Sequence, residues 1–429
     1  MNLARATARD PEEKGQGERT GARAAVVDSG SFVSRAGFAG DACPRVMFPS
    51  VIGHSKSYPH HLDGAPYCGT FEDLYIGEDA LRTEGALAKL VWPIERGVVC
   101  HWEHMEKVWR YSLFSELNIT CPQDCCVLFV EPPLNPRANR ERLTQMMFET
   151  MEISALSVNV GALCVLQAAG DITPCPTGAV VESGYSVSHA VPVFEGHVLH
   201  HAVRTIALAG RDLTQHMLQM IMHEHESFGE RLLPRDRLDV CRDFKKKLCR
   251  VALDYDVEIQ AAAATSAAVA APASSVENEV LPDGSSISVG TKLRIRCPEA
   301  LFRPSLLTSG AKGQKEGEGT AAAQGIHEML FESISACDEP IRNQLYGNIV
   351  LSGGSTMFPN LAARMAQEII ALAPAGTTVN VNGGHVPCRA WVGGSRLAAA
   401  GQARWITAED YWDAGPTVVH SIRTVLCAQ

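Results

Sequence analysis

Two short stretches of the chain place an acid, a serine and a glycine at the end of an apolar run. Residues 26–34 read VVDSGSFVS and residues 180–188 read VVESGYSVS, which is six identities in nine positions at a separation of 154 residues (180 minus 26). Glycine in such a turn lets backbone N–H groups approach an anion, because it has no Cβ. The acid cannot contact a phosphate, but it can hold a water molecule on Mg²⁺. The doubled turn therefore predicts a phosphate- and metal-binding site, although a single turn of this kind more often only connects strands.

The segments that would position these turns alternate between strand and helix. Such alternation is typical of an α/β protein. The repeated turn predicts two related lobes, each contributing one loop to a shared cleft. Apolar runs predict strands at residues 24–27, 127–130, 349–351 and 390–392, the last two followed by glycine turns, and helical spacing predicts helices over 103–117, 139–151, 235–259 and 359–372.

Composition narrows the classes of function. The 429 residues are 46% hydrophobic and 20% charged, with a net charge of −10 and a pI of about 5.8, which argues against a basic nucleic-acid-binding surface. No apolar stretch has the length of a membrane helix, so we expect no membrane insertion. Residues 1–22 are charged throughout, which predicts a disordered tail rather than a signal peptide.

The fourteen cysteines show no disulfide framework and no CxxC pair, so we expect reduced thiols in a cytosolic or nuclear setting. Cys121, Cys125 and Cys126 lie close together, and Cys100, His101 and His104 form a second small group. Neither group completes a four-ligand zinc signature, and we interpret both as incidental.

From Arg35 onward the chain resembles actin and the actin-related proteins. The resemblance implies an actin-like fold of two lobes and four subdomains around a central nucleotide cleft, similar to the sugar kinases and the heat-shock 70 ATPase domain. It also implies that the doubled turn forms two phosphate loops around ATP with Mg²⁺ or Ca²⁺. The motifs that carry it are RAGFAGDACPRVMFPS (35–50), DLYIGEDA (73–80), WPIERGVV (92–99), EPPLNPRANRERLTQMMFET (131–150), LAGRDLT (208–214), LPDG (281–284), RCPEALFRPSLL (296–307), VLSGGSTMFPNLAARM (350–365), WVGGS (391–395) and GPTVVH (415–420).

The same resemblance implies where the subdomains begin and end. Subdomain 1 would contain residues 23–49, 93–168 and 389–429, subdomain 2 residues 50–92, subdomain 3 residues 169–208 and 325–388, and subdomain 4 residues 209–324, with a low-complexity segment at 260–275 and a mobile insertion at 308–324.

Site residues follow from the family positions that this sequence retains. Asp28, Glu182 and His189 match catalytic positions, and Asp28 would hold the metal through a water molecule. The expected nucleotide-binding residues are Gly30, Ser31, Arg35, Ser183, Gly184, Arg242, Lys245, Gly353, Gly354, Ser355 and Phe358. The glycines among them could equally shape turns that the fold needs without a nucleotide.

Several family positions are changed. Phe32 stands where backbone should approach the phosphates, Tyr185 replaces an acid, and Gly161 replaces the glutamine that orients the attacking water. Positioning and charge neutralisation are most of what phosphoryl transfer requires. We therefore expect ATP hydrolysis to be weak or absent, and we leave open whether ATP binds at all. At three further positions, Ser186 replaces a family glycine, Lys246 a glutamate and Pro387 a lysine.

Surfaces that actin uses for assembly have changed as well. The loop between Leu307 and Gly325 carries a hydrophilic insertion, and Arg396 and Ala400 replace larger apolar residues where partners dock. The insertion argues against actin-like filaments, and the changes at Arg396 and Ala400 predict that standard actin-binding partners bind poorly. The first hypothesis is a structural or adaptor component of a cytoskeletal assembly in the cytoplasm, with protein partners. The alternative is an ATP-binding switch subunit that hydrolyses slowly or not at all, in a cytoskeletal or nuclear chromatin complex.

Overall fold

A computed structural model of the chain describes residues 24–55, 74–83, 87–170, 176–226, 228–230, 232–267, 276–308, 324–383 and 386–421. The predicted tail at 1–22 lies outside these residues, as do most of the expected insertion at 308–324 and the end of the low-complexity segment. The chain divides into two compact units, which we describe separately. Unit 1 comprises Met1–Pro176, Glu195–Val198 and Cys388–Gln429, and unit 2 comprises Thr177–Phe194 and Leu199–Pro387.

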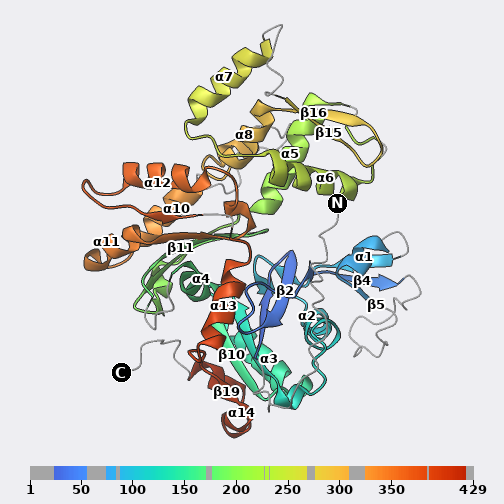
Figure 1. Ribbon diagram of the computed structural model, residues 1–429, viewed down its shortest axis with the longest axis vertical. Helices are drawn as coiled ribbons and strands as arrows, with labels where there is room; N and C mark the ends of the chain where they lie inside the picture. The colour runs from blue at the N-terminus through green and yellow to red at the C-terminus, as the bar shows by residue number, and fades with distance from the viewer. Residues whose placement is uncertain are drawn as a thin grey trace, which may run out of the picture. The chain divides into compact units, whose positions relative to one another are not determined.

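Unit 1 contains strands from both ends of the chain (Figure 1). Its elements are β1 (Ala25–Ser29), β2 (Val33–Phe38), β3 (Val46–Pro49), β4 (Ile52–Ser55), β5 (Leu74–Ile76), α1 (Glu78–Arg82), β6 (Leu87–Val91), β7 (Ile94–Glu95), β8 (Val98–Val99), α2 (Trp102–Arg110), η3 (Tyr111–Glu116), η4 (Pro122–Asp124), β9 (Cys126–Glu131), α3 (Arg137–Gln145), η5 (Met146–Thr150), β10 (Ala155–Val160), α4 (Gly161–Ala169), β13 (His197–Val198), α13 (Arg389–Ala399), β19 (Ile406–Thr407), α14 (Ala408–Ala414) and η9 (Pro416–His420).

The main sheet of unit 1 has the strand order β19-β10-β9-β1-β2-β3, with β1, β9 and β10 parallel. Alternate residues along β1 and β9 face opposite sides of the sheet. Val27 and Phe129 pack in a hydrophobic cluster with residues of α2 and α3, whereas Val26 and Leu128 pack with Trp391 of α13. Both faces of the sheet are therefore buried, which explains why these strands are apolar runs without polar alternation.

Unit 2 contains most of the helices in the second half of the chain. Its elements are β11 (Gly178–Ser183), β12 (Ser188–Phe194), η6 (His200–Ala202), β14 (Arg204–Ile206), α5 (Gly210–Glu224), α6 (Pro234–Leu248), α7 (Tyr255–Ala267), β15 (Val276–Val280), β16 (Ser286–Gly290), α8 (Thr291–Glu299), α9 (Ser305–Thr308), α10 (Ile326–Ser335), α11 (Glu339–Gly347), β17 (Ile349–Ser352), η8 (Gly354–Thr356), α12 (Leu361–Leu372) and β18 (Val381–Asn382).

The sheet of unit 2 repeats the plan of unit 1. Strands run in the order β12-β11-β17-β18, with β14 also paired to β12, and α10 and α11 pack against them (Figure 1). In each unit the first strand forms an antiparallel hairpin with the next strand, and two parallel strands follow on its other side. The α/β fold class that the sequence predicts is confirmed, while the division into four subdomains stays a prediction.

Two predicted elements are wrong. Residues 390–395, expected as a strand and glycine turn, lie inside helix α13. Residues 235–259, expected as one helix, form α6 and the start of α7 with a break between them. The break is held by other parts of unit 2, because the N–H of Arg250 donates to the carbonyl of Arg294 and that of Val251 to the carbonyl of Pro359.

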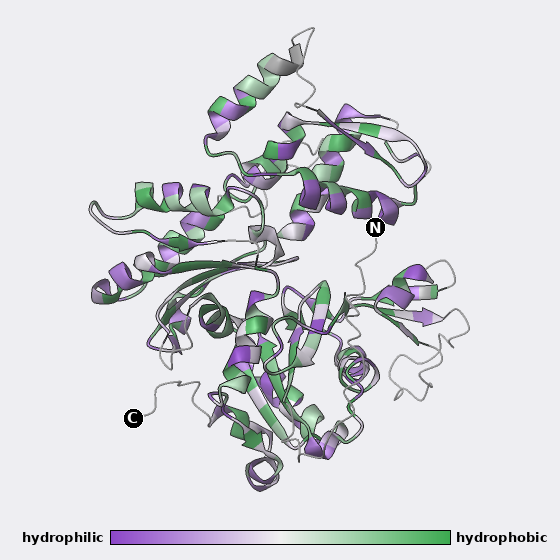
Figure 2. Ribbon diagram, in the orientation of Figure 1, coloured by the Kyte–Doolittle hydropathy of each residue, from purple (hydrophilic) through white to green (hydrophobic). Residues whose placement is uncertain are grey.

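Helices α4 and α13 cross at very short distance, which explains the glycine pair that resembled a turn. The first seven residues of α4 are buried, and Figure 2 shows the helix as hydrophobic. A Cβ on Gly393 would lie 1.6 Å from the carbonyl oxygen of Cys164. Trp391 is fully buried, and its indole N–H donates to the carbonyl of Val26 at 2.9 Å.

Within the described residues no helix combines the length and apolarity that a membrane span requires.

Replacing Gly393 with alanine should destabilise unit 1, because the backbone of α4 would have to move away from the added methyl group. We expect a loss of about 3 kcal/mol of unfolding free energy, which corresponds to a fall in melting temperature of roughly 5–10 °C. The matched control is Gly170→Ala at the end of α4, where a Cβ would meet nothing within 4 Å. Equal melting temperatures for the two variants in a thermal unfolding experiment would contradict the proposed crossing.

Candidate functional site

The first serine-glycine turn connects β1 to β2. The N–H of Gly30 donates to the carbonyl of Val33 at 3.0 Å, and Asp28 lies opposite Arg35 in the hairpin register. Arg35 Nη1 donates to Asp28 Oδ2 at 3.0 Å. Burial opposes the charge on Arg35, but the neighbouring carboxylate of Asp28 keeps the pKa of Arg35 above its usual value. The carboxylate expected to hold a metal-bound water is therefore already neutralised by its own hairpin.

Neighbouring side chains of unit 1 hold this turn in place. Phe32, the residue that replaces a family glycine, stacks on Trp92 with ring centroids 5.5 Å apart and an interplanar angle of 11°. The hydroxyl of Ser31 accepts a hydrogen bond from the N–H of Gly97 at 3.1 Å. The unit thus accommodates Phe32 by aromatic stacking. Two further bonds fix the turn: Ser50 Oγ donates to the carbonyl of Gly30, and Trp109 Nε1 donates to Ser29 Oγ.

The second turn, between β11 and β12, has the same backbone geometry. The N–H of Gly184 donates to the carbonyl of Val187 at 3.1 Å, and Glu182 lies opposite His189. His189 therefore occupies the register position that Arg35 occupies in the first turn. Ser188 Oγ donates to the carbonyl of Leu208 at 2.6 Å.

Two other segments of unit 2 meet the turn at Ser183 and at the carbonyl of Gly184. It accepts the N–H of Gly210 at 3.1 Å and the hydroxyl of Ser355 at 2.8 Å. Gly353, with φ of +91°, lies against the backbone of Ser183, where a Cβ would come within 2.2 Å of the Ser183 carbonyl oxygen. The structure therefore brings together four of the predicted residues: Ser183, Gly184, Gly353 and Ser355.

Lys245 of α6 joins this cluster. Its ammonium group donates to the carbonyl of Gly210 at 2.6 Å and to Thr214 Oγ1 at 2.9 Å. The side chain is 7% exposed, and burial lowers the pKa of Lys245 to about 8. Both hydrogen-bond partners are neutral, so the charge is buried beside acceptors without a described carboxylate partner. A buried cation of this kind fits an anionic ligand.

The remaining predicted nucleotide residues have other surroundings. Arg242 forms an ion pair with Asp239 on its own helix, and Phe358 packs into the main hydrophobic core of unit 2. Pro387 is exposed. Gly354 begins the short η8 helix that carries Ser355.

Several residues that build the two turns were not predicted from the sequence. Gly210 and Thr214 bind Lys245, and Trp92 stacks on Phe32. Gly210 and Thr214 belong to the motif LAGRDLT, which is the only signal that could have found them. Trp92 begins the motif WPIERGVV (92–99), but nothing in that motif relates it to the first turn.

The resemblance assigns the orientation of the attacking water to the glutamine that Gly161 replaces, and a catalytic position to His189. Gly161, in place of a glutamine, is the buried first residue of α4 and has no side chain to donate or accept. His189 shares a hydrogen bond of 2.9 Å between its Nδ1 and Thr205 Oγ1. Burial lowers the pKa of His189 to about 4, so the ring is neutral at physiological pH.

No described group of three or more histidine, cysteine, aspartate or glutamate side chains is arranged to hold a metal ion. His104, from one of the cysteine–histidine groups in the sequence, instead lies with its Nε2 2.8 Å from Nε2 of His54.

The protein consists of two α/β units, and each unit contains one copy of the serine-glycine hairpin. A protein-family model described as Actin matches residues 19–423 of the chain. The chain belongs to the actin family. Members of this family generally bind ATP with a divalent cation, and the residue roles assigned above by resemblance stay predictions for this chain.

The neutral, buried state of His189 predicts a pH-dependent contribution to stability. Its pKa is about 4 in the folded chain and about 6.5 when unfolded. The unfolded state therefore binds more protons between these values, and stability is lost as pH falls from about 6.5 to 4. This residue can account for at most about 3 kcal/mol. His104 and His216 have pKa values lowered to about 4 as well, so the chain should lose more than this in total.

We expect His189→Gln to reduce the acid sensitivity measured by urea unfolding at pH 7.5 and pH 4.5. The control is His197→Gln, since His197 is exposed. Identical pH dependence in wild type and His189→Gln would show that His189 is not a buried neutral base.

Proposed function

We propose that this actin-family chain is a structural or adaptor subunit of a cytoskeletal assembly that does not hydrolyse ATP at a useful rate. The proposal rests on one contrast: the backbone of both turns is retained, whereas side chains that hydrolysis would use are paired or missing. Both hairpins keep the same backbone hydrogen bond, Gly30 to Val33 and Gly184 to Val187. Asp28, however, is neutralised by Arg35, and Gly161 supplies no group to orient water.

Catalysis of phosphoryl transfer depends on placing the attacking water and on neutralising developing charge. The residues at the family positions for the attacking water do not fit that role. We therefore assign no hydrolytic step to them. The backbone frame nevertheless retains the actin architecture. A subunit of this kind contributes a shape and a surface to an assembly, and we place it in the cytoplasmic cytoskeleton, with a nuclear complex as the alternative.

The surroundings of Arg396 support the proposal that the partners of this chain differ from those of conventional actin. Its Nη1 lies 3.3 Å from the carbonyl oxygen of Ala168 and 3.4 Å from those of Gln167 and Gly170, at the C-terminal end of α4. A cation in this position is favoured by the helix dipole. The residue thus has a structural role inside unit 1 and presents a charged group where the resemblance implies an apolar docking surface. We propose that helices that dock on conventional actin bind this chain poorly and that it forms no actin-like filaments.

The experiment that tests the non-hydrolysing function is phosphate release from Mg-ATP by the purified full-length chain, with conventional actin as the positive control. We expect a rate of phosphate release equal to that of ATP in buffer without protein. This should hold both in salt that keeps actin monomeric and in salt that polymerises it. Sedimentation in polymerising salt should leave the chain in the supernatant. Phosphate release well above the buffer rate, or sedimentation like that of actin, would overturn the proposal.

A second function, an ATP-binding switch, is favoured by one observation. Lys245 is a buried ammonium with neutral partners beside the second turn. Lys245, Ser355 and the Gly184 turn would hold the anionic part of ATP if it binds. When bound, ATP would supply a ligand whose contacts bias the conformation of the chain.

For the switch function we expect ATP to raise the melting temperature. At a ligand concentration of about 100 times Kd the gain is about 2.7 kcal/mol, or roughly 5–10 °C. Lys245→Met should abolish the shift, whereas Lys247→Met on the same helix should retain it, because Lys247 is exposed and lies near Glu279. A wild-type chain without any shift rejects the switch and leaves the structural subunit.

A further inference from the structure

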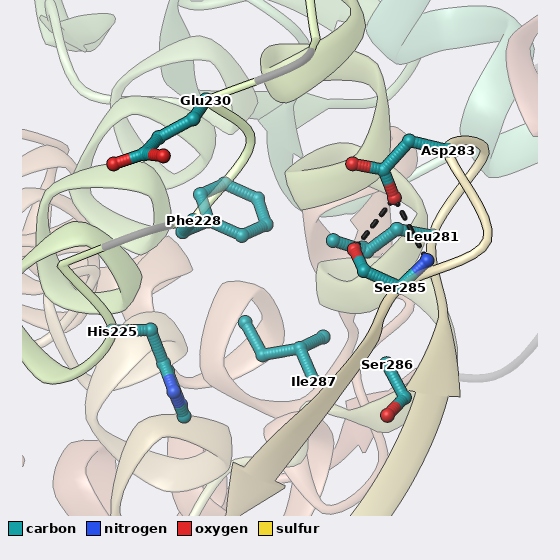
Figure 3. A pocket seen from close by; sticks show the side chains of 8 residues that line it. All are labelled: His225, Phe228, Glu230, Leu281, Asp283, Ser285, Ser286 and Ile287. Carbon is teal, nitrogen blue, oxygen red and sulfur yellow. Dashed lines mark hydrogen bonds between the residues drawn. The ribbon is translucent and has the colours of Figure 1, made fainter.

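Unit 2 contains a pocket that shares no lining residue with the serine-glycine turn. It lies between the segment that follows α5 and the turn of the β15–β16 hairpin (Figure 3), and its volume is about 330 Å³. This volume is at the lower end of the range of small-molecule sites, about 300–1,000 Å³. The pocket therefore suits one side chain better than a cofactor. Its lining residues are His225, Phe228, Glu230, Leu281, Asp283, Ser285, Ser286 and Ile287.

Three apolar side chains form one part of this lining. Phe228, Leu281 and Ile287 are 5%, 6% and 6% exposed and belong to the main hydrophobic core of unit 2. Because they are packed from behind, their positions are fixed before any ligand arrives. A ligand that enters the pocket thus meets a preformed surface of one aromatic ring and two aliphatic side chains.

The polar part of the lining is acidic. Asp283 Oδ1 accepts hydrogen bonds from the N–H of Ser285 at 3.0 Å and from its hydroxyl at 2.5 Å, which hold the carboxylate in place (Figure 3). Glu230 is exposed, and in the described part of unit 2 it makes no hydrogen bond or ion pair. No lysine or arginine is among the described lining residues. The pocket therefore offers negative charge beside an apolar surface.

Two acids of the β15–β16 hairpin lie outside the pocket lining and have basic partners. Glu277 lies 3.7 Å from Arg294, and Glu279 lies 3.7 Å from Lys247, so their charges have partners within unit 2. The carboxylate of Glu230 at the pocket has no such basic partner among the described residues.

Two exposed apolar residues are neighbours of lining residues, one across the hairpin and one along the sequence. Val280, 73% exposed, lies directly opposite the lining residue Ser286 in the hairpin, so the two side chains share one face. Leu233, 69% exposed, follows Glu230 by three positions.

We propose that this pocket receives an arginine side chain presented by a protein partner. The methylene groups of arginine would pack on Leu281 and Ile287, and its guanidinium would lie over Phe228 and donate to the carboxylates of Asp283 and Glu230. Arginine fits better than lysine because its planar, forked group both stacks on an aromatic ring and donates in several directions. This inference rests on the proposed function only in taking the partner to be a protein.

The probe that tests the pocket is N-acetyl-arginine N-methylamide, titrated into the full-length chain and followed by ligand-observed NMR. The matched probe is the citrulline analogue, which has nearly the same shape and no charge. We expect the arginine probe to bind about tenfold more tightly, as the loss of a charge-assisted hydrogen bond implies. Equal binding of the two probes, or no binding of the arginine probe at millimolar concentration, would overturn the proposal.

Two variants locate the binding. Glu230→Gln and Asp283→Asn should each weaken the arginine probe about tenfold, whereas Glu277→Gln, on the same hairpin and outside the pocket, should leave it unchanged. Asp283→Asn also alters the bonds to Ser285, so Glu230→Gln is the decisive variant: unchanged affinity there refutes the site. Failure of arginine binding leaves the phosphate-release result untouched, so the two proposals fail separately.

Discussion

The carbonyl oxygen of Gly184 is the point on which the interior of unit 2 depends. It accepts hydrogen bonds from Gly210 and from Ser355, and so joins the β11–β12 turn to the first residue of α5 and to η8. A buried carbonyl without these donors would be costly. Gly353 completes the junction, since only a residue without a Cβ can approach Ser183 so closely at a positive φ. These residues are therefore required by the architecture of the unit, whether or not a ligand binds there.

The two hairpins show how one backbone frame can carry different electrostatics. In the first turn the register position opposite the acid holds Arg35, which is charged and paired with Asp28. In the second turn the same position holds His189, which is buried, neutral and bonded to Thr205. The frame is set by backbone hydrogen bonds and glycine, so substitutions at the side-chain positions change the chemistry while the fold is retained.

The sequence predicted the elements that can be identified from an unbroken run of buried apolar side chains. The apolar runs at 127–130 and 349–351 are strands, and the α/β class follows from their alternation with helices. Tertiary contacts decided the rest. Gly393 and Gly394 look like a turn, but Gly393 allows α13 to approach Cys164 of α4. The helix break at Arg250 and Val251 depends on carbonyls of Arg294 and Pro359, far along the chain. The retained turn residues could be read from the sequence, whereas the stacking of Trp92 on Phe32 could not.

The contacts of the first turn involve two of the six tryptophans of the chain. Trp92 stacks on Phe32, and the indole N–H of Trp109 donates to Ser29, so two tryptophans touch residues of this one turn. Indole emission responds to stacking and to the loss of a hydrogen bond from its nitrogen. The contributions of Trp92 and Trp109 to the intrinsic fluorescence should therefore change when the β1–β2 turn rearranges, against a background from the other four tryptophans.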